Sequence, residues 1–292
     1  MRQLPLRNEW LWTIAACALL LLAVRPFWGL TVDDALISFR YAQNWVAGCG
    51  PVFSCGEAPV EGYTNFLWVA LAALAMLFEL PVVTTMQVLG LLCGAASLGL
   101  AARLASRLFQ SPVAGIGAAL GLAASPFFAL NSVIALETSA ATLSVIAGVY
   151  FSLELPRRRP VTAGVAWAMS YLIRPEALAF AFITGLYGLA RGLLLSPRGL
   201  ERSFLRGRLW PTVAGLLRYS GGFLAVAGPF FVWRAIYYSS LFPNTYYAKK
   251  GKLEVLVPHN LELLWKHPVF WVALGIGALF ALALRRRGPV LY

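Results

Sequence analysis

The stretch WLWTIAACALLLLAVRPFWGLTVDD, residues 10–34, decides the fold class of this chain. Residues 10–30 are an apolar run of roughly 20 residues, the length that a helix needs to cross a bilayer. The run lacks the small-residue cleavage pattern of a signal peptide, so we expect a retained helix. Asp33 and Asp34 follow it directly. Acidic residues beside a membrane span are costly unless they face water, a metal ion or a substrate, so we expect function to be concentrated here.

The composition of the whole chain favours a membrane protein. Of its 292 residues, 60% are hydrophobic and only 12% are charged, and the mean hydropathy is +0.72. A soluble domain of this composition would expose too much apolar surface. We therefore expect an all-α polytopic membrane protein, a helical bundle of about eight transmembrane helices. The expected spans are residues 10–30, 84–102, 112–130, 138–155, 160–174, 176–194, 210–234 and 268–284.

The net charge of +12 does not indicate nucleic-acid binding, because the arginines stand in short clusters between apolar spans. This is the pattern of cytoplasmic loops under the positive-inside rule. The clusters are Arg2/Arg7, Arg103/Arg107, Arg157–Arg159, Arg191 to Arg208 and Arg285–Arg287. We expect the N-terminus and all of these clusters on the cytoplasmic side of a bacterial plasma membrane. Most acidic residues then lie on the outer side.

This topology requires that residues 65–80, NFLWVALAALAMLFEL, do not cross the membrane. If they crossed, the cluster Arg157–Arg159 would face outward. We therefore expect a helix that lies in or dips into the outer interface. The chain is then one transmembrane domain with two outer segments, residues 31–83 with interfacial helices and residues 235–267. Proline disfavours helical geometry in the residue before it, so Arg174-Pro175 predicts an outer turn between two spans.

Four cysteines are present. Cys17 and Cys93 lie in apolar helices and are typical of core or lipid-facing positions. Cys49 and Cys55 flank the turn-rich segment GPVFS. Outside the cytoplasm a disulfide between them is chemically permitted, and the alternative is two free thiols.

Under this topology four polar motifs reach one face of the membrane. They are TVDDALISFRYAQNW (31–45), VEGYTNFLW (60–68), the breaks around Glu137 and around Arg174-Pro175-Glu176, and LFPNTYYAKKGK (241–252).

Each motif has a purely structural interpretation beside the functional one. Thr31 and Asp34 have the spacing of a helix-capping box. Ile37, Tyr41 and Trp45 would form one face of an interfacial helix.

The remaining motifs leave similar alternatives open. Gly62 fits a tight turn. Glu137 is either a loop carboxylate or the partner of a cation or metal. Arg174 either forms a local salt bridge with Glu176 or binds an anionic headgroup. The lysines of residues 249–252 are either solvated charges or phosphate ligands.

The sequences DDALISFRY (33–41), EGYTNFLW (61–68), RPE (174–176) and PNTYYAK (243–249) resemble the motifs of GT-C membrane glycosyltransferases. The set is most similar to the terminal β-(1→2)-arabinofuranosyltransferase and pilin arabinofuranosyltransferase family, and it covers residues 10–252. The resemblance implies a GT-C-type bundle with an extracytoplasmic active site. Family members usually continue beyond such a bundle, so we expect a fragment, a truncated product or a minimal form.

The resemblance also implies a reaction. The donor would be a polyprenyl-phosphate sugar such as decaprenyl-phospho-arabinofuranose, and the acceptor a cell-wall glycan or a protein. In the family the acidic motif of the first outer loop carries catalysis, which corresponds here to Asp33 and Asp34. Glu137 matches a second outer acidic position.

From these observations we predict residue roles. Asp33 or Asp34 is the general base for the acceptor hydroxyl. A divalent cation, Mg²⁺ or Ca²⁺, would suit Asp33, Asp34 and Glu137, although nothing in the sequence requires one. The predicted ligands of the donor phosphate are Arg40, Arg174 and Lys249. The predicted substrate contacts are Tyr41, Glu61, Tyr63, Thr64, Asn65, Glu137, Glu176, Asn244 and Tyr246.

Two other classes of function stay open. A lipid-sugar flippase or transporter would place charged residues near the bilayer midplane, whereas these acids gather at one edge. An inactive fragment that scaffolds a partner is distinguished from the enzyme by the activity of the purified chain.

Overall fold

The computed structural model describes residues 9–153, 155–156, 158–194, 209–240 and 244. The chain divides into two units, residues 1–241 and 242–292, and all of the elements below belong to the first. Every regular element in this part of the chain is a helix. The elements are α1 (Glu9–Ala23), η2 (Arg25–Phe27), α2 (Asp33–Val46), α3 (Phe66–Leu77), α4 (Val82–Phe109), α5 (Pro112–Ala123), α6 (Pro126–Asn131), α7 (Thr138–Ser152), α8 (Pro160–Ile173), α9 (Ala177–Leu194) and α10 (Trp210–Tyr237).

The all-α prediction is therefore confirmed for the described residues. Three helical segments are long and apolar enough to span a membrane, namely Trp10–Phe27, Val82–Phe109 and Trp210–Tyr237. Large apolar side chains are also exposed on outer helix faces, for example Trp10 on α1, Phe182 on α9 and Ile236 on α10. Exposed apolar surface of this extent is typical of contact with lipid and supports membrane association.

Several expected spans have different bounds, and prolines account for two of the differences. The expected span 112–130 is divided into α5 and α6, because Ser125 caps a new helix that has Pro126 in its first turn. The expected span 10–30 ends as an α-helix at Ala23 and continues as the short 3₁₀ turn that contains Pro26. The expected span 268–284 lies outside the described residues.

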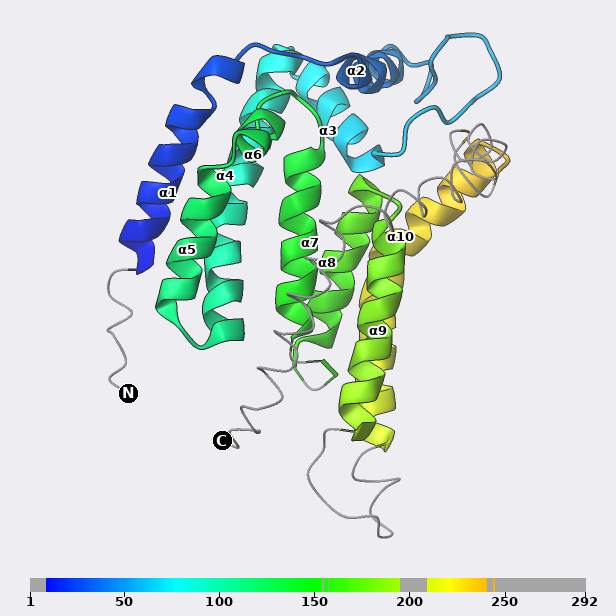
Figure 1. Ribbon diagram of the computed structural model, residues 1–292. Helices are drawn as coiled ribbons and strands as arrows, with labels where there is room; N and C mark the ends of the chain where they lie inside the picture. Colours follow the sequence, from blue (N-terminus) through cyan, green and yellow to red (C-terminus); the bar gives the residue numbers. More distant parts are fainter. Residues whose placement is uncertain (1–8, 154, 157, 195–208, 241–243, 245–292) are drawn as a thin grey trace, which may run out of the picture. The chain divides into compact units, whose positions relative to one another are not determined.

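The long helices alternate in direction along the bundle (Figure 1). One end carries α2, α3 and the connections α6–α7 and α8–α9, and we call it the α2 end. The opposite end carries the start of α1, the connections α4–α5 and α7–α8, the end of α9 and the start of α10. We call it the arginine end, after Arg103, Arg107, Arg158, Arg159 and Arg191. Among the described residues, the arginines of the predicted clusters thus lie at the end opposite the acidic motifs, and the clusters Arg2/Arg7 and Arg285–Arg287 lie outside the described residues.

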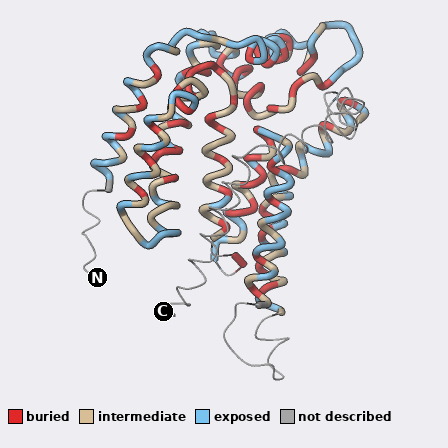
Figure 2. The backbone as a smooth tube through the Cα atoms, viewed as in Figure 1, coloured by how far each residue is buried: buried red, intermediate tan, exposed pale blue. Residues whose placement is uncertain are grey.

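Buried side chains concentrate between the helices and at the α2 end, as Figure 2 shows. One hydrophobic cluster includes Phe39 of α2, Trp68 of α3, Met86 of α4 and Ile173 of α8. Burial of each large apolar side chain stabilises the fold by about 1.5–3 kcal/mol, and it holds α2 and α3 against the bundle.

Helix α3 agrees in position with the expected non-crossing helix. Its 12 residues span roughly 18 Å, less than the ~30 Å hydrocarbon core of a bilayer. It packs most extensively against α2 at the α2 end of the bundle (Figure 1).

Two structural interpretations of α2 are not borne out. The helix begins at Asp33 with Val32 as its N-cap, and no side chain caps it, so Thr31 and Asp34 form no capping box. The predicted face is also displaced: Ile37 is exposed, whereas Tyr41 is buried. The buried face instead includes Ser38 and Asn44, because their polar partners lie in the segment that follows the helix.

Cys49 and Cys55 form a disulfide, with 5.5 Å between their Cα atoms. This bond closes a short loop directly after α2. Asn44 donates from Nδ2 to the carbonyl oxygens of Val52 and Phe53 inside that loop, at 3.0 and 2.7 Å. Cys17 and Cys93 are free thiols.

We expect a thiol count to confirm this pairing. Denatured chain treated with a maleimide of high mass should be labelled at Cys17 and Cys93 only, and at all cysteines after reduction. Replacement of Cys49 by Ser should lower the free energy of unfolding by about 2 kcal/mol, since the closed loop is short. Labelling of Cys49 without reductant would contradict the assignment.

Candidate functional site

A chain of polar contacts crosses the α2 end from α2 to the start of α9. Asn65, just before α3, donates from Nδ2 to Ser38 Oγ of α2 at 3.0 Å and to Glu137 Oε2 at 2.9 Å. Glu137, just before α7, forms an ion pair with Arg174, whose Nη2 lies 2.7 Å from Glu137 Oε1. Three of the four predicted motifs therefore meet, although they are far apart in the sequence.

The two partners in this ion pair differ in exposure. The Glu137 side chain is 9% exposed, whereas the Arg174 side chain is 45% exposed. Arg174 also has extended backbone at the end of α8, as expected for the residue before Pro175. Glu137 thus holds one side of the guanidinium, while the rest faces outward at the α2 end. A guanidinium presented in this way can still bind an anion bidentately.

A second ion pair at this end is almost fully buried. Arg234, near the end of α10, donates from Nε to Glu61 Oε2 at 2.6 Å. Arg234 lies one turn beyond Pro229, and the last turns of α10 lean toward the loop that carries Glu61 (Figure 1). A proline inside a helix permits such a bend. The pair fastens residues 47–65 to α10.

Burial raises the pKa of the Glu61 carboxyl, and the Arg234 guanidinium partly offsets this effect. Removing two charged groups from water costs free energy, and their mutual attraction offsets this cost only when their geometry is favourable. The pair therefore fixes the position of the loop relative to α10 and contributes little net stability. The role of Glu61 as a substrate contact stays a prediction. In this structure its carboxylate is buried and faces Arg234.

Two tyrosines make a third connection. Tyr238 donates from its hydroxyl to the Pro51 carbonyl at 2.7 Å, and Tyr63 Oη lies 3.0 Å from Tyr238 Oη. Since Tyr238 has one hydroxyl proton, Tyr63 is the donor of the second bond. Burial raises the pKa of both phenols, so they stay neutral donors. The disulfide loop is thereby held to the end of α10.

Tyr41 explains the glycine at position 62. Its hydroxyl donates to the Val60 carbonyl at 2.8 Å and accepts from the Gly62 N–H at 2.9 Å. A Cβ on Gly62 would lie 2.6 Å from Tyr41 Oη. The predicted tight turn at Gly62 is wrong: the residue is not part of a turn, and it is small because the tyrosine hydroxyl approaches its backbone.

The loop before Glu137 contains a residue with strained backbone, and a hydrogen bond from Trp68 supports it. Ala135 has φ +63°, a region that costs a residue with a Cβ about 1–2 kcal/mol. Its carbonyl accepts from Trp68 Nε1 at 3.0 Å. Trp68, from the predicted EGYTNFLW motif, thus holds the loop that aims Glu137 at Asn65 and Arg174.

The predicted catalytic carboxylates lie at the exposed first turn of α2. Asp33 and Asp34 are both exposed and make no ion pair or side-chain hydrogen bond in the described part of the chain. Asp34 is one turn before Ser38 and lies on the same side of the helix, roughly 6 Å along the axis. Asp33 points in a different direction.

The metal prediction has no geometric support. Among the described residues, no group of three or more His, Cys, Asp or Glu side chains is placed to hold a metal ion. Glu137 is occupied by Asn65 and Arg174.

Other predicted residues are placed as follows. Arg40 donates to the Phe53 carbonyl at 3.2 Å and so holds the disulfide loop. Thr64 is half-buried, and Glu176 and Asn244 are exposed. Of the two alternatives for Arg174, the local salt bridge with Glu176 does not form, because Arg174 pairs with Glu137. Lys249 and Tyr246 lie outside the described residues, as does nearly all of the fourth motif.

Sequence reasoning missed Ser38, Arg234 and Tyr238. Arg234 carried a usable signal: it is a charged residue within a mostly apolar span, and such residues often pair inside the protein. Ser38 and Tyr238 carried none, since their partners stand at distant positions in the chain.

No protein-family model, curated protein or solved structure matches this chain.

The Glu61–Arg234 pair can be tested with single and double substitutions. Glu61→Leu or Arg234→Met alone should lower the free energy of unfolding by about 3–5 kcal/mol, because each leaves a buried charge unpaired. The double variant should lie closer to wild type than either single variant. Denaturant titration of detergent-purified chain measures all three, and additive losses would contradict a direct pair.

Gly62→Ala tests the approach of Tyr41. The added methyl must displace the Tyr41 hydroxyl, so we expect a loss of about 1–3 kcal/mol. The control is Gly121→Ala in α5, where an added Cβ would meet no atom within 4 Å and alanine should be neutral or stabilising. Equal melting temperatures for the two variants would show that Gly62 has room.

Proposed function

We propose that this chain is a glycosyltransferase of the GT-C type. It moves a sugar, arabinofuranose according to the resemblance, from a polyprenyl-phosphate donor to an extracytoplasmic glycan or protein. The proposal includes a bundle of about eight transmembrane helices in a bacterial plasma membrane. The N-terminus is cytoplasmic, and the α2 end is the outer, active face.

One observation carries the proposal: an exposed carboxylate lies one helical turn from a polar network that ends at a partly exposed guanidinium. Asp34 is one helical turn from Ser38, and Ser38 is joined through Asn65 and Glu137 to Arg174. Sugar transfer from a lipid phosphate needs a base for the acceptor and a cation for the departing phosphate. Asp34 and Arg174 would supply these two groups at the same end of the bundle.

The reaction is a single group transfer. An Asp34 carboxylate takes the proton from the acceptor hydroxyl, and the acceptor oxygen forms a bond to the anomeric carbon. The bond between that carbon and the phosphate oxygen breaks, and the polyprenyl phosphate leaves with the electron pair. Arg174 stabilises the negative charge on the phosphate. Glu137 is a positioning residue, since it acts by holding Arg174.

The orientation of the two aspartates favours Asp34 as the base. Asp34 is on the side of α2 that carries Ser38, whereas Asp33 is turned by roughly 100° about the helix axis. Asp33 remains placed to face the sugar or its water shell, since both side chains are exposed.

Transfer from a radiolabelled polyprenyl-phospho-arabinofuranose, measured in membranes that contain the chain, tests this assignment. Asp34→Asn should reduce transfer by about 10²-fold to 10⁴-fold, the usual contribution of a general base. Glu57→Gln is the matched control, because Glu57 is also an exposed acid of the same outer segment. Transfer by Asp34→Asn at the wild-type rate would overturn the base assignment. Absence of transfer from every donor in a panel of polyprenyl-phosphate sugars would overturn the proposed function.

A further inference from the structure

A cavity of about 410 Å³ at the arginine end is bordered by three guanidinium groups. Arg107 comes from the last turn of α4, and Arg158 and Arg159 come from the segment before α8. Tyr150 and Phe151, near the end of α7, complete the lining. This site is at the opposite end of the bundle from the network of Glu137 and Arg174.

Arg107 has a local reason for its position. Cations are favoured in the last turn of a helix by its macrodipole. The Arg107 guanidinium carbon also lies 4.4 Å from the centroid of the Tyr150 ring, a favourable cation–π contact. The tyrosine holds the guanidinium at the edge of the cavity.

The helix macrodipole does not favour the positions of Arg158 and Arg159. They stand at the N-terminus of α8, where the macrodipole is positive and cations are disfavoured. Arg159 is the N-cap residue, and no side chain caps the helix. Three arginines, two of them directly before the positive end of α8, therefore line one small space.

No acidic side chain is among the residues that line this cavity in the described part of the chain. Like charges so close raise the free energy of the folded state unless an anion neutralises them. Glu154, the only acid between α7 and α8 in the sequence, lies outside the described residues.

We propose that this cavity binds a phosphate-bearing anion. The guanidinium forks of Arg107, Arg158 and Arg159 match phosphate oxygens. The volume is within the ~300–1,000 Å³ typical of small-ligand sites. The phosphate belongs either to the headgroup of an anionic phospholipid or to a soluble phosphate.

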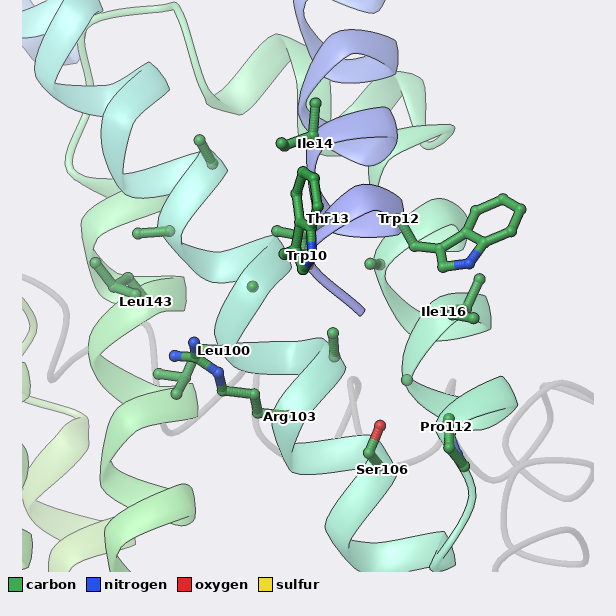
Figure 3. A pocket seen from close by; sticks show the side chains of 16 residues that line it. Trp10, Trp12, Thr13, Ile14, Leu100, Arg103, Ser106, Pro112, Ile116 and Leu143 are labelled. Atoms are coloured by element: carbon green, nitrogen blue, oxygen red, sulfur yellow. The ribbon is translucent and has the colours of Figure 1, made fainter. Parts of the chain in front are cut away.

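A second cavity shows what distinguishes this one. The cavity of about 580 Å³ between α1, α4 and α5 is drawn in Figure 3, and among the described residues Arg103 is its only charged lining side chain. Its other lining residues are mostly apolar, including Trp10, Ile116 and Leu143. It concentrates no charge, although Arg103 is exposed on the same helix as Arg107 and one turn before it.

Arg103→Gln is therefore the matched control for Arg107→Gln. Both remove one exposed arginine from neighbouring turns of α4, and only Arg107 borders the proposed site. The probes are phosphatidylglycerol and inorganic phosphate, each titrated into the purified full chain in detergent and followed by native mass spectrometry. Neither readout depends on sugar transfer.

Arg107→Gln should weaken binding by about fivefold, which corresponds to ~1 kcal/mol per arginine at a charged lipid surface. Joint replacement of Arg158 and Arg159 by Gln should weaken it further, and Arg103→Gln should leave it within about twofold of wild type. Arginine-dependent binding of phosphatidylglycerol alone supports a lipid headgroup, and arginine-dependent binding of inorganic phosphate supports a soluble ligand.

Two results would overturn the proposal. One is equal binding by the Arg107→Gln and Arg103→Gln variants in both titrations. The other is a wild-type chain that binds neither probe while Glu154→Gln does, since Glu154 would then be the neutralising group. Because the three arginines are exposed, circular dichroism of the variants should match wild type and exclude loss of folding as the cause.

Discussion

Two glutamates buried at the α2 end, Glu61 and Glu137, each need a cation, and this requirement joins elements that are distant in the sequence. Glu61 takes Arg234 from the end of α10, and Glu137 takes Arg174 from the junction of α8 and α9. A buried carboxylate without a partner would cost several kcal/mol. The positions of the outer loop, α7, α8 and α10 at this end are therefore mutually dependent.

The segment between α2 and α3 shows how a loop without regular structure is given one conformation. Its disulfide closes the first part, and Asn44 and Arg40 of α2 bind its carbonyl groups. Tyr41 binds the part around Gly62, and Tyr238 binds Pro51 from the far side. Nearly every fastening uses a polar side chain on a helix and a backbone group in the loop. Such loops can present functional groups on a rigid support.

The two ends of the bundle differ in how their charged side chains are paired. At the α2 end, Arg174 and Arg234 are each neutralised by a glutamate, and the exposed carboxylates Asp33 and Asp34 stand without cations among the described residues. At the arginine end, Arg107, Arg158 and Arg159 gather around one cavity. Among the described residues, a group of exposed positive charges therefore gathers at the arginine end, and exposed negative charge is present at the α2 end.

The sequence by itself determined the helical class, the separation of charge between the ends among the described residues, and the gathering of three motifs at one end. These features depend on local composition and on the alternating direction of successive helices, and both can be read from the sequence. Only the tertiary structure decided that Arg174 pairs with Glu137 and not Glu176, that Glu61 pairs with Arg234, and that Gly62 makes room for Tyr41. It also decided between a disulfide and two thiols for Cys49 and Cys55. The physical reason is that a buried polar group takes whichever partner the packing brings within about 3 Å, and sequence spacing does not record that distance.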